Sequence, residues 1–152
     1  MAMTREEKIA LKKSETGIDH DMIDQLVRTF YQKIEIDPVL GPIFNDLIDD
    51  WEPHLLKMID FWSSATLKSG TYKGNPLVKH LSMPIDARFF DHWLQLFEKT
   101  AAEICPPKAA ALFKEKSKMI AHSLELGIAI KNGNLPMNGD RYINHELNVP
   151  AE

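Results

Sequence analysis

The sequence of 152 residues predicts a single all-α domain. Apolar residues recur at three- and four-residue spacing through most of the chain, which is typical of helices that bury one face. Stretches that alternate polar and apolar residues, as half-buried strands do, are missing from the sequence. Pro and Gly residues divide the periodic stretches into segments of helical length. A chain of this length can bury one core but is too short for two comfortable domains.

Two helices and a short corner are expected in the first half. The apolar face of the first helix is formed by Met22, Ile23, Leu26, Val27, Phe30, Tyr31 and Ile34. Either Asp19 or Asp21 can cap its start, because a carboxylate oxygen accepts a bond from a free backbone N–H of the first turn. Asp37-Pro38 ends this helix, and residues 39–45 form a helical corner. Residues 51–67 form the next helix, which Gly70 ends.

Two longer helices are expected in the second half. Pro84 and Asp86 open the first, whose apolar side carries Phe89, Phe90, Trp93, Leu94, Phe97, Ala101 and Ile104. Pro106-Pro107 separates it from the last helix, whose stripe includes Leu112, Phe113, Ile120, Leu124 and Ile128. Gly133 is the expected stop signal.

The ends of the chain are polar and lack an apolar period. We therefore divide the chain into a polar N-terminal extension (1–17), the globular domain (18–132) and a flexible C-terminal tail (133–152). The tail is expected to contribute little to any site in the domain. Its apolar residues, through which it could instead dock on the domain or on a second copy, are Leu135, Met137, Tyr142 and Ile143.

Composition excludes several classes of partner. Eighteen basic and 22 acidic residues leave a net charge of −4, so neither nucleic acid nor an anionic membrane is an expected partner. Cys105 is the one cysteine, which excludes an intrachain disulfide and favours a reducing compartment. The charged N-terminus has no apolar signal core behind it, and no run is long enough to span a bilayer. A cytoplasmic location is expected.

The segment from Gly70 to Leu81 is the most informative part of the sequence. Gly70 and Gly74 permit backbone conformations that are closed to other residues, and Pro76 begins a short helical turn that carries His80. A second imidazole, His54, lies on the apolar face of the preceding helix. Two histidines from different elements among large apolar side chains suggest a flat apolar cofactor with an axial ligand. Haem is the leading candidate.

The order and spacing of several motifs strengthen this interpretation. They are Phe30-Tyr31, Leu40-Gly41-Pro42-Ile43-Phe44-Asn45, Trp51 with His54, Phe61-Trp62, Tyr72 with Gly74, Pro76-Leu77 with His80-Leu81, and Phe89-Phe90 with Trp93. Together they resemble the truncated haemoglobins of the third group, also called class P. The resemblance extends from about Asp21 to Ile130. The paired-glycine motifs typical of the first two groups are missing.

The resemblance implies a truncated globin, a two-over-two helical sandwich around haem b (iron protoporphyrin IX). It implies that His80 is the proximal iron ligand and that Tyr31, His54 and Trp93 surround dioxygen or another diatomic ligand at the ferrous iron. The residues expected to contact the cofactor are Phe44, Met58, Tyr72, Leu77, Lys79, His80 and Leu81. Met58 departs from the family, in which many members carry a branched aliphatic residue, so the volume of the distal cavity can differ.

Each of these residues also has an ordinary structural interpretation. A lone histidine before an apolar helix is usually a capping or surface residue, and His54 can be a half-exposed helix histidine. Tyr31 and Trp93 can serve packing alone, although a buried phenol or indole N–H needs a hydrogen-bond partner. His92 points away from the side of the helix that carries Trp93, so it is expected on the surface.

The resemblance leaves the reaction open. Nitric oxide dioxygenation, peroxidase-like activation of peroxide, and sensing or transfer of a diatomic ligand are all compatible with it. Turnover as an enzyme would need an external electron donor such as a reductase, because the chain has no flavin or nicotinamide site of its own. The alternative of a different class is a haem-free helical module that binds another protein, in which the aromatic stripes form only a core or a partner groove.

Overall fold

The computed structural model describes residues 2–136 and 140–149. Within them the chain is helical and contains no strand. The helices are α1 (Arg5–Thr16), α2 (His20–Ile36), α3 (Gly41–Leu47), α4 (Trp51–Leu67), α5 (Pro76–His80), α6 (Ala87–Ile104) and α7 (Pro107–Lys131). The all-α prediction is confirmed. None of these helices is long and apolar enough to cross a membrane.

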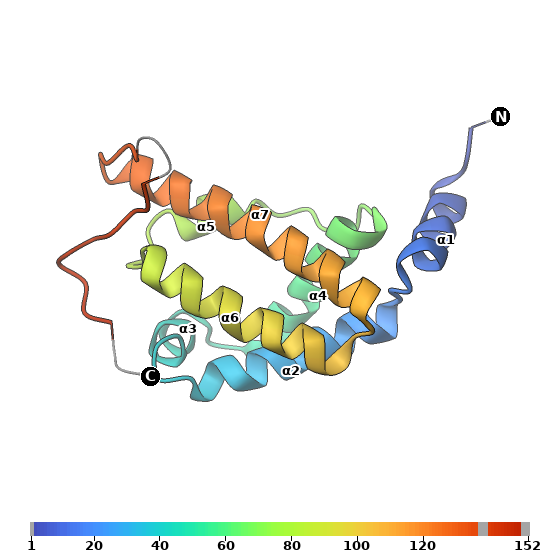
Figure 1. Ribbon diagram of the computed structural model, residues 1–152, viewed down its shortest axis with the longest axis horizontal. Coiled ribbons are helices and arrows are strands. Elements are labelled where there is room, and N and C mark those ends of the chain that lie inside the picture. The colour runs from blue at the N-terminus through green and yellow to red at the C-terminus, as the bar shows by residue number, and fades with distance from the viewer. Residues whose placement is uncertain (1, 137–139, 150–152) are drawn as a thin grey trace.

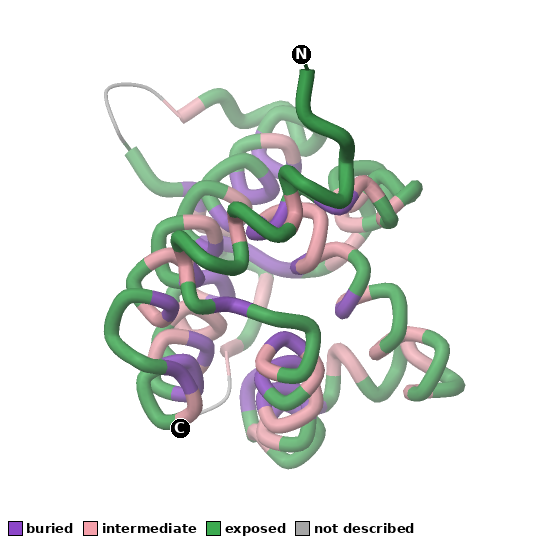
Figure 2. The backbone as a smooth tube through the Cα atoms, turned by 90° about the vertical axis from the view of Figure 1, so that its right-hand side faces the viewer, coloured by how far each residue is buried: buried purple, intermediate pink, exposed green. Residues whose placement is uncertain are grey.

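Four long helices form two layers. Helix α2 packs against α4 and α6, and α7 packs along α6 and against α4 (Figure 1). The layers are therefore the pair α2 and α4 and the pair α6 and α7, which is the predicted two-over-two sandwich. Figure 2 shows the buried stretches of these helices turned toward the interior.

A cluster of aromatic rings holds the layers together. Phe97 of α6 is 1% exposed, and its ring stacks on Trp62 of α4 at 4.9 Å and on Trp93 of its own helix at 5.3 Å between centroids. Phe30 of α2 and Phe113 of α7 meet the same ring edge-on. One side chain thus contacts all four long helices, and such aromatic pairs add to the hydrophobic stabilisation.

The starts of the helices follow the expected caps. Asp19 accepts a hydrogen bond from the backbone N–H of Met22 at 2.9 Å and begins α2. Asp86 accepts from the N–H of Arg88 at 3.0 Å and begins α6. Helix α4 ends at Leu67, as predicted, and its cap residue Lys68 takes a left-handed conformation with φ 58°. Gly70 itself has φ 71° and turns the chain toward α5.

The two ends of the described chain differ. Helix α1 buries no residue and projects from the sandwich (Figure 1), and Ile18, 0% exposed, is the first residue sealed in the core. The tail passes the start of α6 (Figure 1), where Tyr142 is 4% exposed and its carbonyl accepts a hydrogen bond from the N–H of Ala87. Met137 lies outside the described residues. The proposed domain boundaries stay a prediction, but the tail is docked at Tyr142.

Candidate functional site

A cavity of about 390 Å³ lies between the two helical layers. Its volume is within the range of small-molecule and cofactor sites. The walls are mostly apolar and aromatic, and they include Leu40, Ile43, Phe44, Met58, Phe61, Phe90, Ile120 and Leu124. Polar side chains converge on this apolar space, as in a cofactor site. They are Tyr31, Asp49, Asp50, His54, Lys57, Tyr72, Lys79, His80 and Trp93.

His80 reaches the cavity from the end of α5. Asn75 caps this five-residue helix, and Pro76 begins it with a preset φ. Because a carbonyl can only accept, Nδ1–H of His80 donates to the carbonyl oxygen of Pro76 at 2.6 Å, which leaves the lone pair on Nε2. Burial lowers the pKa of His80 against the opposing effect of the Pro76 carbonyl. The ring is therefore neutral at pH 7, as a metal-binding imidazole must be.

His54 reaches the same cavity from the first turns of α4. Its ring meets the Tyr31 ring edge-on, at 5.3 Å between centroids and 89° between planes. The Nε2 atom is buried and has no hydrogen-bond partner among the described residues. Burial lowers the pKa of His54, and the positive charges of Lys57 and Lys79 lower it further, as does His80 when it is protonated. A buried polar atom without a partner, beside a cavity, indicates a place where a ligand would complete the hydrogen bonding.

Tyr31 and Trp93 add two further donors from α2 and α6. Tyr31 is 6% exposed, and burial raises the pKa of its phenol well above the usual range, so the hydroxyl keeps its proton. The stacking of Trp93 on Phe97 and its edge contact with Phe30 fix the indole plane. Within residues 2–136 and 140–149, no hydrogen bond involves the Tyr31 hydroxyl or the Trp93 indole N–H. Both residues line the cavity.

The expected cofactor contacts fall into two groups. Phe44, Met58, Tyr72, Lys79 and His80 line the cavity. Leu77 and Leu81 do not line it. They lie against Gly127 of α7, where an added Cβ would collide with Leu77 and approach Leu81 at 3.6 Å. Whether these two leucines also touch a cofactor stays a prediction.

Several cavity residues were not expected from the sequence. Phe61, Ile120 and Leu124 were recognised as apolar, but periodicity cannot tell a cavity wall from solid core. Lys57 was missed altogether. Lys57 follows His54 by three residues, which puts both side chains on one side of α4. This spacing could have predicted Lys57 as a cavity residue.

The prediction for His92 was wrong. The side chain is 13% exposed, and its Nε2 lies 2.8 Å from both carboxylate oxygens of Asp37. The corner between α2 and α3 brings Asp37 against α6, a long-range contact that helical periodicity cannot show. Asp37 also accepts hydrogen bonds from the N–H groups of Val39 and Leu40. It therefore joins α6 to the start of α3.

Comparison with known proteins identifies the family, although no family model matches the chain. Over 109 residues, the sequence is 37% identical to "Group 3 truncated hemoglobin ctb" of Campylobacter jejuni subsp. jejuni serotype O:2. That alignment covers 68% of this chain and 86% of the relative. A crystal structure of group III truncated haemoglobin from Campylobacter jejuni matches with a TM-score of 0.68 at 32% identity. It covers 81% of this chain and 96% of that one. This chain belongs to the group III truncated haemoglobins.

Membership in this family gives the cavity a globin-type role, the binding of haem and of a small ligand. The site fits such a group. A neutral imidazole is available at His80, an unpartnered nitrogen at His54, and the walls between them are apolar. In the described part of the chain, no three His, Cys, Asp or Glu side chains gather where they could hold a metal ion by themselves. A truncated haemoglobin needs no such cluster, because one axial histidine holds haem iron from the protein side.

Proposed function

We propose that this truncated haemoglobin binds haem b through Nε2 of His80, with dioxygen and other diatomic molecules as ligands on the opposite side. The observation that carries the proposal is the buried, unpartnered Nε2 of His54, which belongs to the same cavity as the neutral ring of His80. A haem-free interaction module gives no reason for this atom to be buried without a partner, since that costs about 1–3 kcal/mol.

His80 is proposed as the axial ligand. The hydrogen bond from Nδ1–H to the Pro76 carbonyl orients the ring and selects the tautomer with a free Nε2. A carbonyl acceptor withdraws the Nδ1 proton less strongly than a carboxylate would. His80 is therefore a moderately basic ligand, and the proximal side does not favour a strongly peroxidase-like activity.

Tyr31, His54 and Trp93 are proposed as distal groups. Haem, when bound, would supply a ferrous iron, and a dioxygen ligand there would carry partial negative charge. The neutral phenol of Tyr31 and the indole N–H of Trp93 can each donate to such a ligand, and His54 lies edge-on to Tyr31 on the neighbouring helix. Several donors around one small ligand slow its escape. Bulk oxygen delivery is therefore disfavoured relative to nitric oxide dioxygenation, peroxide chemistry or ligand sensing.

Polar groups at the cavity edge are proposed for the carboxylates of the cofactor. Tyr72 and Lys79 line the cavity, and Lys57 joins them there. The Tyr72 ring packs edge-on against Phe61 at 5.3 Å between centroids. A catalytic cycle would also require an external electron donor, for which we propose a reductase.

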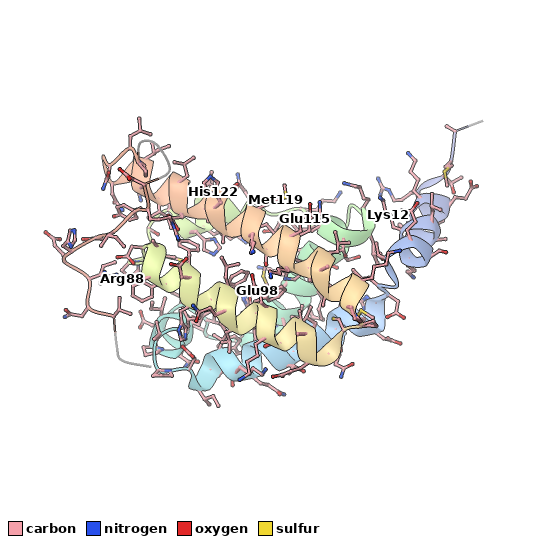
Figure 3. The ribbon with its side chains drawn as sticks, in the orientation of Figure 1. Lys12, Arg88, Glu98, Glu115, Met119 and His122 are labelled. Carbon is pink, nitrogen blue, oxygen red and sulfur yellow. The ribbon has the colours of Figure 1, made fainter. Side chains whose placement is uncertain are left out.

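The test is haem binding by the purified protein. We expect a Soret band in the wild-type protein with added haemin and its loss or marked weakening in His80→Ala. His122→Ala is the matched control, because His122 is an exposed histidine on the outer side of α7 (Figure 3). A wild-type protein that leaves the spectrum of added haemin unchanged would favour the haem-free module, and an unchanged band in His80→Ala would require another ligand.

A further inference from the structure

The described part of the tail lies against the start of α6 and is held there at Tyr142. The Asn132 amide donates to the Tyr142 hydroxyl at 3.0 Å, and the N–H of Ala87 donates to the Tyr142 carbonyl at 2.8 Å. The side chain of Tyr142 is buried in the core. These contacts join the end of α7 to the first turn of α6.

Arg141 binds carboxylates of both helices. Its Nε and Nη2 donate to the two oxygens of Glu125 on α7 at 2.8 and 2.6 Å, and Nη2 also donates to Asp91 on α6 at 2.8 Å. The Glu125 side chain is only 9% exposed. A bidentate pair with a nearly buried carboxylate is stronger than an ordinary surface ion pair. Removal of the guanidinium would leave Glu125 buried without its charge partner.

Asp86 provides a second attachment point. It is 0% exposed and accepts hydrogen bonds from Arg88 and from the backbone N–H of Asn144 at 3.0 Å. Arg88 lies at the start of α6, on the side where the tail passes (Figure 3), and also donates to the Asn144 carbonyl at 3.1 Å. The buried cap of α6 thus depends on the tail for part of its hydrogen bonding.

A short hydrogen-bonded loop leads from this attachment to His80. The N–H of Met83 donates to the His80 carbonyl, and the N–H of Ile85 donates to the Met83 carbonyl, both at 3.0 Å. The next residues are Asp86 and Ala87, which the tail binds. A second cavity of about 260 Å³ separates parts of this loop from Asn144 and Leu147. The hydrogen bonds from the tail reach this loop at its far end, at Asp86 and Ala87.

We propose that residues 141–147, the C-terminal clamp, set the position of His80 through the loop 81–86, and that Arg141 is the positioning residue that locks the clamp. The inference rests on the proposed ligation of iron by His80. The tail lines no part of the large cavity within its described residues, so the clamp acts on the proximal side indirectly, through this loop.

The experiment compares Arg141→Ala with Arg28→Ala in the full-length protein. Arg28 is a matched control, because it also bridges two carboxylates, Asp24 and Glu52, on the α2–α4 side. For Arg141→Ala we expect amide hydrogen exchange at Met83, Ile85 and Ala87 to become about tenfold faster. We also expect a shifted or broadened iron–histidine stretching band in the ferrous, ligand-free protein. Arg28→Ala should leave both readouts at their wild-type values.

Equal exchange rates and an unmoved band in Arg141→Ala would overturn the proposal. If Arg141→Ala does not fold, Arg141→Lys takes its place, since it keeps the charge but loses the bidentate geometry, and it should move both readouts in the same direction. A different measurement shows whether the proposed function itself fails. A wild-type iron–histidine band that persists in His80→Gly would refute ligation by His80, while the exchange rates would still test the clamp.

Discussion

The proposed distal and proximal walls of the cavity are built in different ways. Tyr31 and Trp93 belong to helices of 17 and 18 residues, α2 and α6, whose aromatic rings pack on one another across the core. His80 belongs to a helix of five residues that buries none of them. Dense packing therefore fixes the distal groups. A small number of hydrogen bonds and one close contact, at Gly127, fix the proximal group.

Because of this difference, we expect one wall to control ligand binding and the other to control retention of the cofactor. A well-packed core allows little side-chain displacement, so the distal donors keep their directions when a ligand enters. A short helix between loops opens at lower free energy than a core helix. We therefore expect distal substitutions to change ligand kinetics or global stability, and proximal substitutions to change axial ligation and haem loss.

The largest effect is expected on the proximal side. His80→Gly should abolish tight haem binding, or leave a space in which added imidazole restores the spectrum of a protein with one axial nitrogen. The measurement is the visible and resonance Raman spectrum with and without imidazole. If the native iron–histidine band survives without imidazole, another residue is the ligand.

The second prediction tests the packing of the distal wall. Phe97→Ala should lower the free energy of unfolding by about 3–5 kcal/mol, because it removes the ring that contacts all four long helices and leaves a cavity. Denaturation in urea measures this loss, with Phe97→Leu as a milder control. A loss below about 1 kcal/mol would mean that the aromatic cluster does not hold the layers together.

The third prediction divides the distal groups by role. Tyr31→Phe and Trp93→Phe should each speed dioxygen dissociation, since each removes a donor worth about 1–3 kcal/mol, or about 5- to 150-fold in rate. His54→Leu should act mainly on association, by changing the entrance. Stopped-flow ligand displacement separates the two rates. Unchanged dissociation in all three variants would refute the distal donor assignment.

The fourth prediction concerns the contact that seats α5. Gly127→Ala should cost about 1 kcal/mol of stability and speed haem loss, because the new methyl group collides with Leu77. The cost is modest since Leu77 is 39% exposed and can turn away. Leu77→Ala in the same protein should restore the wild-type rate of haem transfer to an acceptor protein. If the double variant does not recover the wild-type rate of haem transfer, the collision with Leu77 is not the cause of the faster haem loss.

The smallest effect is expected at the corner of the distal wall. Burial acts to raise the pKa of Asp37, but hydrogen bonds from His92, Leu40 and Val39 outweigh it, so the pKa lies below its ordinary value of 3.8. A lowered folded-state pKa adds stability above pH 3.8, and this contribution disappears as the pH falls through the folded-state value.

Asp37→Asn keeps acceptor capacity for the backbone of α3 but cannot titrate. We expect its stability to fall less steeply than that of the wild type below about pH 4, by less than ~1 kcal/mol because the pair is partly solvated. Urea denaturation between pH 5 and pH 3 measures the difference. If the stability of the variant and of the wild type falls in parallel with pH, Asp37 does not contribute this pH-dependent stability.

The sequence by itself determined the helices and the types of residue at the site. The apolar period of α2, the cap at Asp19, and the Pro and Gly breaks act over a few residues, so they can be recognised without knowledge of the fold. The resemblance to the truncated haemoglobins came from motif order and spacing, and it nominated His80, His54, Tyr31 and Trp93. The structure places all four around one cavity.

Only the tertiary structure decided which distant residues meet. It paired His92 with Asp37, turned Leu77 and Leu81 toward Gly127, and buried Tyr142 of a tail that the sequence presents as polar and irregular. The physical reason is that a helix period specifies which side of a helix is apolar but not which neighbour will cover it. That choice depends on the packing of complete helices against one another and on the hydrogen bonds that buried carboxylates such as Asp86 and Glu125 must find.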